Sequence, residues 1–409
     1  MTFSVEYSDA CRIVRSLALS LARAGVVSEE LLSPQALPAG RLHELAGAVA
    51  LFFGLDGERA AALEKLDSYA QWADHVYREA QGAALVFSTS GSSGHPSLHS
   101  FIMRDLEEEA ESLKPFFADR RRIVSVMPVH HIFGFAFALT LPRVLGIQVL
   151  DLPPLPTGDF FRALRSGDLL LAFPVFWKSV LDMCSGPSAP AVPPDIRGVS
   201  SGAPCPPEVI EGLLGAGPGG GKPLCAGMTE IYGATEFGAV GIRGECRGGY
   251  TLLPHWRRLP LPAGPDGEEW GIGRGRGEAQ PLPDRIGWSD ERHFVPLRRM
   301  DKAVQVAGIN VFPERVVALL RGHPAVADCA VRLMRPEEGV RLKAFVVPRA
   351  GVMADTFLMR ELRRLLTVGL EPASRPKSIR FGECLPGTPT GKSADWDIDD
   401  GEADAGVCT

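Results

Sequence analysis

No pattern of cysteines in this 409-residue sequence is typical of a metal site or of a disulfide framework. The eight cysteines are scattered, with no C-x-x-C pair and no zinc-ligand spacing. We therefore expect them to be reduced thiols, as in a cytosolic protein. They are Cys11, Cys184, Cys205, Cys225, Cys246, Cys329, Cys384 and Cys408.

Long hydrophobic runs and a strong charge of either sign are also missing. The longest apolar region, residues 132–141, is only about ten residues long, too short to cross a bilayer. Arg12, Arg15 and Arg23 interrupt the apolar pattern at the start of the chain, unlike the core of a signal peptide. The net charge of −6 argues against nucleic acid or an anionic membrane as the main partner. We expect a cytoplasmic protein with no nucleic-acid partner and no membrane insertion.

Two common nucleotide-binding motifs are absent as well. No G-x-G-x-x-G follows a predicted strand in the first third of the chain, which disfavours a Rossmann oxidoreductase. The glycines of Gly91-Ser92-Ser93-Gly94 are too closely spaced for the Walker pattern, and no lysine follows them.

The first half of the sequence contains a regular alternation of strand and helix patterns. Short apolar or β-branched runs are each followed by a stretch with helical spacing of its apolar residues. This order predicts an α/β fold, in which a large N-terminal domain has mainly parallel sheets covered by helices. Strands are expected at 83–87, 123–127, 148–152 and 169–173, and helices at 105–114, 133–145, 160–164 and 176–183. In the helix at 105–114, Glu107, Glu108 and Glu109 are interpreted as a solvated face and Pro115 as the end.

A second domain is expected after Met300, where the pattern becomes a small α+β arrangement. A chain of this length is too long for one compact core. We predict a large domain at 1–300 and a small C-terminal domain at 301–409.

The stretch STSGSSGHPS, residues 88–97, is rich in hydroxyl-bearing side chains and in glycine, which leaves backbone N–H groups accessible. Such a loop can form an anion site from backbone N–H groups and hydroxyls, or it can be a flexible surface turn. Because it follows the strand expected at 83–87, it is predicted to lie at the carboxyl edge of a parallel sheet, where α/β folds bind ligands.

Four other sets of residues have both a chemical and an ordinary structural interpretation. His130 and His131 follow a strand and are either packed or catalytic. Thr235 and Glu236 follow Tyr232-Gly233, and they could contact a phosphate and Mg²⁺ or simply begin a helix. Asp284 and Arg299 could hold a ribose or be surface charges. Lys392, on a Gly-Thr-Pro loop, could be an exposed lysine.

The order and spacing of these five sets resemble the adenylate-forming superfamily. This superfamily includes acyl- and aryl-CoA synthetases, 4-coumarate:CoA ligases, firefly luciferase and stand-alone adenylation domains. The resemblance extends from about Ala83 to Lys392, and the chain is similar to a compact member. It implies that a carboxylate attacks the α-phosphorus of ATP and displaces pyrophosphate. A phosphopantetheine thiol, on CoA or on an acyl carrier protein, then displaces AMP.

The resemblance also implies a role for each nucleotide-binding residue. Adenine is expected to lie beside Tyr232 and Gly233, and the ribose between Asp284 and Arg299. The β- and γ-phosphates are expected at Thr89, Ser90, Gly91, Ser92, Ser93 and Gly94. The adenine pocket is expected at Ser201, Gly202, Ala203 and Pro204.

The catalytic roles implied by the resemblance concern charge and positioning. His131 is expected beside the acyl carboxylate, Thr235 on the α-phosphate, and Glu236 on Mg²⁺. Lys392 is expected to bridge the carboxylate and the α-phosphate during adenylation. Asp301 is the expected hinge of the small domain, and Gly308 is expected at the thiol tunnel.

The sequence departs from the family pattern at several positions. Ser97 stands where the phosphate loop usually has lysine, so pyrophosphate binding is expected to be weaker unless His95 or His99 supplies a donor. The usual Thr-Gly-Asp is Leu282-Pro283-Asp284, and Gln305 replaces a frequent lysine.

The substrate is inferred from what surrounds the histidine pair. Residues 127–140 contain no acidic residue to hold an ammonium group, and the nearby aromatics suggest an apolar acyl or aryl acid. The aromatics are Phe133, Phe135, Phe176 and Trp177.

One alternative is an enzyme that loads only a carrier protein. Another is a degenerate nucleotide-binding or scaffold protein of the same fold without ligase activity.

Overall fold

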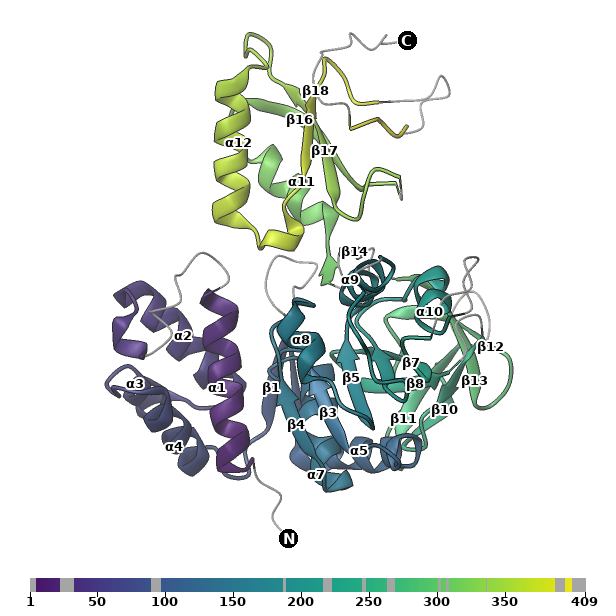
Figure 1. Ribbon diagram of the computed structural model, residues 1–409. Coiled ribbons are helices and arrows are strands. Elements are labelled where there is room, and N and C mark those ends of the chain that lie inside the picture. Colours follow the sequence, from purple (N-terminus) through teal and green to yellow (C-terminus); the bar gives the residue numbers. More distant parts are fainter. Residues whose placement is uncertain are drawn as a thin grey trace. The chain divides into compact units, whose positions relative to one another are not determined.

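The protein is described from a computed structural model, which divides into two compact units (Figure 1). The larger unit comprises Met1–Thr89 and Leu98–Arg298, and the smaller unit includes the chain from Arg299 onward. The residues described are 5–22, 33–89, 97–186, 189–215, 223–244, 248–262, 269–300, 303–306, 309–335, 337–386 and 394–398.

The larger unit begins with a group of helices that pack around buried aromatic rings. Phe53 and Trp72 are fully buried, and α1 packs on both α2 and α4. Ser68 begins α4 by accepting a hydrogen bond from the backbone N–H of Gln71. The elements are α1 (Tyr7–Ala22), η2 (Pro34–Ala36), α2 (Ala39–Phe52), α3 (Gly57–Leu63) and α4 (Tyr69–Glu79).

A nine-stranded sheet forms the centre of this unit in the described part of the chain, with the order β12-β13-β9-β8-β7-β6-β5-β3-β4. The five strands from β4 to β7 are parallel, whereas the β7–β8, β8–β9 and β9–β13 pairs are antiparallel. The predicted α/β class is therefore confirmed, with an antiparallel extension. The strands are β3 (Arg122–Ser125), β4 (Gln148–Asp151), β5 (Asp168–Ala172), β6 (Arg197–Ser200), β7 (Gly227–Ala234), β8 (Gly238–Arg243), β9 (Tyr250–Leu252), β12 (Asp284–Trp288) and β13 (His293–Arg299).

Helices cover both faces of the parallel strands. In β5, Leu169 and Leu171 belong to one buried cluster, and Leu170 and Ala172 belong to another, because successive side chains point to opposite faces. The first cluster includes residues of α5 (Met103–Phe117), α6 (Ile132–Phe135), η3 (Ala136–Thr140) and α7 (Leu141–Leu145). The second includes residues of α8 (Gly158–Ala163), α9 (Pro174–Cys184) and α10 (Pro207–Leu213).

The strand expected at 83–87 does not join this sheet. The segment forms β1 (Leu85–Thr89), which pairs with β2 (Ser97–Phe101) in a separate two-stranded sheet. Phe87 packs edge-on against Phe52 and Phe101, with ring centroids 5.1 and 5.6 Å apart. The expectation that this strand belongs to the parallel sheet is therefore wrong, and the serine-glycine loop that follows it lies outside the described residues. Another two-stranded sheet consists of β10 (Trp256–Pro260) and β11 (Trp270–Arg274).

Two expectations for the helix at 105–114 are also wrong. The helix α5 continues to Phe117 with Pro115 inside it, because the proline lies in the last turn. Glu109 is fully buried and not solvated. It lies three residues after Leu106 and four before Leu113, so it shares their inward face.

The smaller unit is a three-stranded sheet with two helices packed on it (Figure 1). β17 pairs antiparallel with β16 and parallel with β18. Leu358, Leu362 and Leu366 of α12 enter its core. The elements are β14 (Val304–Val306), β15 (Ile309–Val311), α11 (Pro313–Arg321), β16 (Val326–Leu333), β17 (Leu342–Pro348), α12 (Thr356–Gly369), η4 (Pro372–Ser374) and β18 (Ser378–Phe381).

Most of the described cysteines are free thiols, as expected. Cys384 is disulfide-bonded, which corrects the expectation for that residue. The free thiols are Cys11, Cys184, Cys205, Cys225 and Cys329. No helix in the described residues is long and apolar enough to cross a membrane.

The backbone at Gly238 generates the first prediction. Gly238 has φ +77°, and a Cβ there would lie 2.2 Å from the buried carboxylate of Glu109. Gly146 has φ +68° with open space around it. We expect Gly238→Ala to lower the free energy of unfolding by about 3 kcal/mol, and Gly146→Ala by only about 1 kcal/mol. Urea unfolding followed by tryptophan fluorescence measures both, and equal losses would contradict the assigned contact.

The burial of Glu109 generates the second prediction. Desolvation raises the pKa of Glu109 from 4.5 to about 7, although Arg274 and a backbone N–H oppose the shift. Ionisation is therefore harder in the folded than in the unfolded state, so this carboxyl group costs stability progressively as the pH rises from 4.5 to 7. Relative to Glu109→Gln, the wild type should lose about 3 kcal/mol across that range. Urea unfolding of both proteins at several pH values tests this, and a constant difference would contradict it.

Candidate functional site

Three of the predicted site segments lie at one edge of the central sheet. β3, β6 and β7 belong to its parallel part, so their carboxyl ends lie at the same edge. His131 follows β3, Ser201 follows β6 directly, and Thr235 follows β7 directly. The strand order thus brings together side chains that are far apart in the sequence.

Thr235 and Glu236 form the tip of the β7–β8 hairpin and not the start of a helix. Ala234 pairs with Gly238, and the N–H of Phe237 donates to the carbonyl of Ala234 over 3.0 Å. The positive φ of Gly238 completes a short hairpin loop of the kind built on a tight turn followed by a left-handed residue. Both tip side chains are half-buried.

The chemistry of Glu236 fits a hard cation. Its carboxylate has no hydrogen-bond or ion-pair partner within the residues that the structure describes, and it stands at the tip of the hairpin. Magnesium binds through one or two carboxylates together with water and phosphate oxygens. Glu236 could therefore supply one protein oxygen to a magnesium ion that is otherwise held by a nucleotide.

The segment after β6 is fastened to β7 at two points. The Ser201 hydroxyl donates to the carbonyl of Ile231 over 3.0 Å, and the Cys205 N–H donates to Oε1 of Glu230 over 3.0 Å. Glu230 is buried and forms an ion pair with Arg243 at 2.6 Å. The intervening residues Gly202, Ala203 and Pro204 are thus held beside β7.

Tyr232 and Asp284 are in direct contact. The Tyr232 hydroxyl donates a hydrogen bond to Oδ2 of Asp284 over 2.7 Å. The Tyr232 ring packs against Tyr250 and Phe294, with centroids 5.7 and 5.4 Å away, which fixes its position. Asp284 is the first residue of β12 and is half-buried. The structure thus joins two residues that are 52 positions apart in the sequence.

The two neighbouring histidines have different environments. Nδ1 of His130 lies 2.8 Å from the Ser16 hydroxyl of α1. His131 is the N-cap residue of α6, and its side chain remains exposed while the surrounding domain partly desolvates the ring. This desolvation lowers the pKa of His131, which favours the neutral imidazole.

The aromatic residues used to infer the substrate are mostly core residues. Phe135, Phe176 and Trp177 are at most 2% exposed, and the indole N–H of Trp177 donates to the carbonyl of Val199. Phe133 packs against Phe137, with ring centroids 4.8 Å apart. These rings fill the interior, so three of the four give no information about the acid.

The remaining predicted residues are placed only in part. Thr89 ends β1, and Arg299 ends β13. Gly233 is exposed on β7. The other predicted site residues lie outside the described residues, namely Ser90, Gly91, Ser92, Ser93, Gly94, Asp301, Gly308 and Lys392.

The segment that follows Lys392 in the sequence is anchored to the smaller unit. The Ala394 N–H donates to the carbonyl of Pro386 over 3.0 Å. The ammonium group of Lys343 on β17, a fully buried residue, donates to Asp395 over 3.0 Å and to the carbonyl of Trp396 over 2.5 Å. A buried lysine thereby fixes the chain at Asp395 and Trp396, just beyond Ala394.

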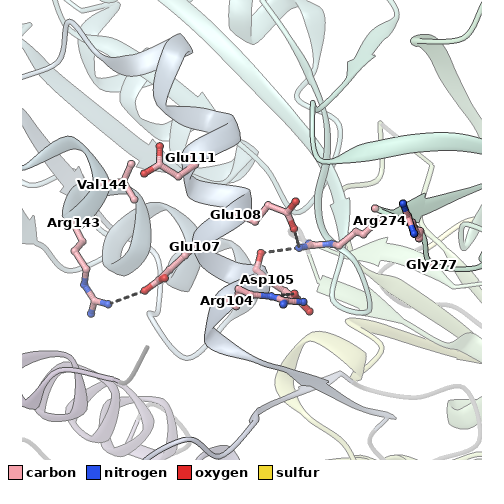
Figure 2. Close-up of a pocket in the computed structure, with 11 residues that line it drawn as sticks. Arg104, Asp105, Glu107, Glu108, Glu111, Arg143, Val144, Arg274 and Gly277 are labelled. Carbon is pink, nitrogen blue, oxygen red and sulfur yellow. Dashed lines mark hydrogen bonds and ion pairs between the residues drawn. The ribbon is translucent and has the colours of Figure 1, made fainter. Parts of the chain in front are cut away.

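The structure also contains an open hollow beside α5 that the sequence did not suggest (Figure 2). Its volume is about 860 Å³, and charged side chains line it. Arg143 pairs with Glu107, and Arg274 pairs with Glu108 across it (Figure 2). The lining contains none of the residues predicted to bind ATP or the acid, and its charges largely neutralise one another.

Comparison with known protein families identifies both parts of the chain. Residues 8–262 match the AMP-binding enzyme family, and residues 318–392 match the AMP-binding enzyme C-terminal domain. This chain belongs to the AMP-binding enzymes. The resemblance seen in the sequence motifs is confirmed. The 4-coumarate–CoA ligase of Rhodobacter capsulatus is 35% identical to this AMP-binding enzyme over 81% of the chain and 80% of its own length. The 4-coumarate–CoA ligase of Halorhodospira halophila is 34% identical over 85% of each.

Solved structures of a CoA synthetase and a CoA ligase share the fold at low sequence identity. The o-succinylbenzoate CoA synthetase of Bacillus subtilis has a TM-score of 0.60 and 17% identity, covering 95% of this chain and 92% of its own. A malonyl-CoA ligase has a TM-score of 0.57 and 20% identity, covering 75% and 72%.

The Tyr232–Asp284 hydrogen bond generates the third prediction. Tyr232→Phe keeps the ring but removes the donor, so Asp284 loses the contact that orients it. We expect ATP to bind about tenfold more weakly, since hydrogen bonds to charged groups contribute about 1.5–3 kcal/mol. Calorimetric titration with ATP measures the effect. Tyr77→Phe, at an exposed position of α4, is the matched control. Equal affinity of the two variants would argue against a nucleotide site at Asp284.

Proposed function

We propose that this enzyme activates an acyl or aryl carboxylic acid with ATP and transfers the acyl group to a phosphopantetheine thiol. The thiol is that of CoA or of an acyl carrier protein. The named relatives are ligases of an aryl-propenoic acid and CoA, which supports an aryl acid and CoA as the first pair to test.

The observation that carries the proposal is the arrangement at the end of β7. Tyr232 hydrogen-bonds Asp284, the anchored Ser201 segment lies beside the same strand, and the Thr235–Glu236 tip follows it. Adenine can stack on an aromatic ring, and ribose hydroxyls can donate to a carboxylate. Phosphate can accept from a hydroxyl, and magnesium can bind a second carboxylate. A scaffold without activity has no need of all four.

In the proposed first step, an oxygen of the acid attacks the α-phosphorus of ATP and the bond to pyrophosphate breaks. Thr235 donates to the α-phosphate, Glu236 holds the metal, and neutral His131 lies beside the carboxylate without adding a competing charge. Magnesium, when bound, neutralises charge on the phosphates. Lys392 stabilises the negative charge that develops in the transition state.

In the proposed second step, the sulfur of the thiol attacks the acyl carbon and AMP leaves with the bonding electrons. Rotation of the small domain about Asp301 would remove Lys392 and bring Gly308 to the thiol. Alternation of two domain positions allows one pocket to serve both reactions.

The fourth prediction tests this function by pyrophosphate release from ATP and Mg²⁺ with a panel of aryl and fatty acids. We expect release with one acid class, and a loss of about 100-fold or more in Lys392→Ala, because the lysine stabilises transition-state charge. Lys377→Ala, another lysine of the smaller unit with an exposed side chain, is the control and should retain activity.

The outcome also separates the alternatives. Release that requires an acid, followed by thioester formation with CoA, establishes an acid–CoA ligase. Thioester formation only with a carrier protein identifies a loading enzyme. ATP binding without release for any acid would overturn the proposal and favour a nucleotide-binding protein without ligase activity.

A further inference from the structure

A cluster of buried polar side chains, which the sequence did not reveal, binds the backbone of the β7–β8 hairpin. Oε1 of Glu109 accepts a hydrogen bond from the Ala239 N–H over 3.0 Å. The indole N–H of Trp256 donates to the Ala239 carbonyl over 2.8 Å. Both backbone groups of Ala239 are therefore bound by side chains from other elements, α5 and β10.

Arg274 of β11 completes the cluster. Its guanidinium donates to the Phe237 carbonyl over 3.3 Å and lies 3.6 Å from Oε2 of Glu109. It also stacks over the Trp256 ring at 4.5 Å and donates to the carbonyl of Asp105 on α5. Figure 2 shows Arg274 reaching from its strand toward α5.

These contacts surround the tip without involving its side chains. They bind Phe237 and Ala239, the residues that follow Thr235 and Glu236 in the hairpin. Gly238 faces the Glu109 carboxylate so closely that a Cβ there would lie 2.2 Å from its oxygen. Three side chains, from α5, β10 and β11, thus fix the position of the hairpin tip.

A buried carboxyl group at this position is not explained by stability. Oε2 of Glu109 has no hydrogen-bond partner in the described residues and only the ion pair with Arg274. Buried ion pairs are often no more stabilising than well-packed apolar side chains of the same size. The group does, however, provide a directional contact to a backbone N–H, which an apolar side chain cannot.

We propose that Glu109, with Arg274 and Trp256, is a positioning residue that sets the Thr235–Glu236 tip for the adenylation step. This inference rests on the function proposed above. In the proposed function, Glu236 would hold the magnesium ion that neutralises charge on the triphosphate during adenylation. Thioester formation from an acyl-adenylate does not release pyrophosphate, so it depends less on that carboxylate.

The test measures the two steps separately in Glu109→Leu, Glu109→Gln and the control Glu108→Gln. Glu108 is the neighbouring half-exposed residue that pairs with the same arginine at 3.9 Å but does not reach the hairpin. We expect Glu109→Leu to lower the adenylation kcat about tenfold or more and to raise the Mg²⁺ concentration for half-maximal rate. Thioester formation from a supplied acyl-adenylate should change about twofold at most. Glu109→Gln keeps an acceptor for the Ala239 N–H and should retain most of the rate.

Equal loss in both steps would show a general structural role and overturn the proposal. If Glu109→Leu does not fold, Trp256→Phe removes the contact to the Ala239 carbonyl from the other side and should give the same unequal loss.

A second measurement does not depend on turnover. Hydrogen exchange of the segment around Ala239 should be faster in Glu109→Leu than in Glu108→Gln. Unchanged exchange would overturn the positioning role. If the wild type itself releases no pyrophosphate, the proposed function fails, and the exchange experiment still decides whether Glu109 holds the hairpin.

Discussion

The candidate site depends on the double pairing of β7. This strand is hydrogen-bonded in parallel to β6 and in antiparallel to β8, so it belongs to both halves of the sheet. The parallel side brings the segment after β6 alongside it, and the antiparallel side turns the chain back within three residues at Thr235–Phe237. Tyr232, near the end of the strand, can then reach Asp284 on β12. Without this change of direction, the tip residues would continue into a crossover helix, as after the other parallel strands.

Two buried carboxylates support this strand in the same manner. Glu230 accepts from the Cys205 N–H and pairs with Arg243, which lies 4.5 Å from the Tyr250 ring. Glu109 accepts from the Ala239 N–H and pairs with Arg274, which lies 4.5 Å from the Trp256 ring. In both cases an arginine pairs with the buried carboxyl group while an aromatic ring supports the guanidinium. Glu230 and Arg243 hold the segment that follows β6, whereas Glu109 and Arg274 hold the turn that follows β7.

Much of the fold could be predicted from the sequence because it depends on local patterns. Alternating apolar runs and helical stripes located the strands and helices of the parallel half, and the ordered motifs indicated the family. The partner of β1 could not be predicted, because an apolar run does not specify which strand it pairs with. Glu109 was misinterpreted because it is one of three consecutive glutamates. Only its spacing from Leu106 and Leu113 shows that it lies on the buried face of the helix. The aromatics near the histidines were misleading because core and binding pockets use the same residue types.

The contact between Gly238 and Glu109 has a consequence for the evolution of this enzyme. A side chain at 238 would occupy the space of the Glu109 carboxylate, 2.2 Å from its oxygen. Position 238, 129 residues further along the chain, is therefore not free to change while glutamate stands at position 109. A lineage that acquired a larger residue at 238 would first have to shorten the side chain at 109, giving up the contact to Ala239. Glutamate at position 109 should accordingly be found only where position 238 is glycine.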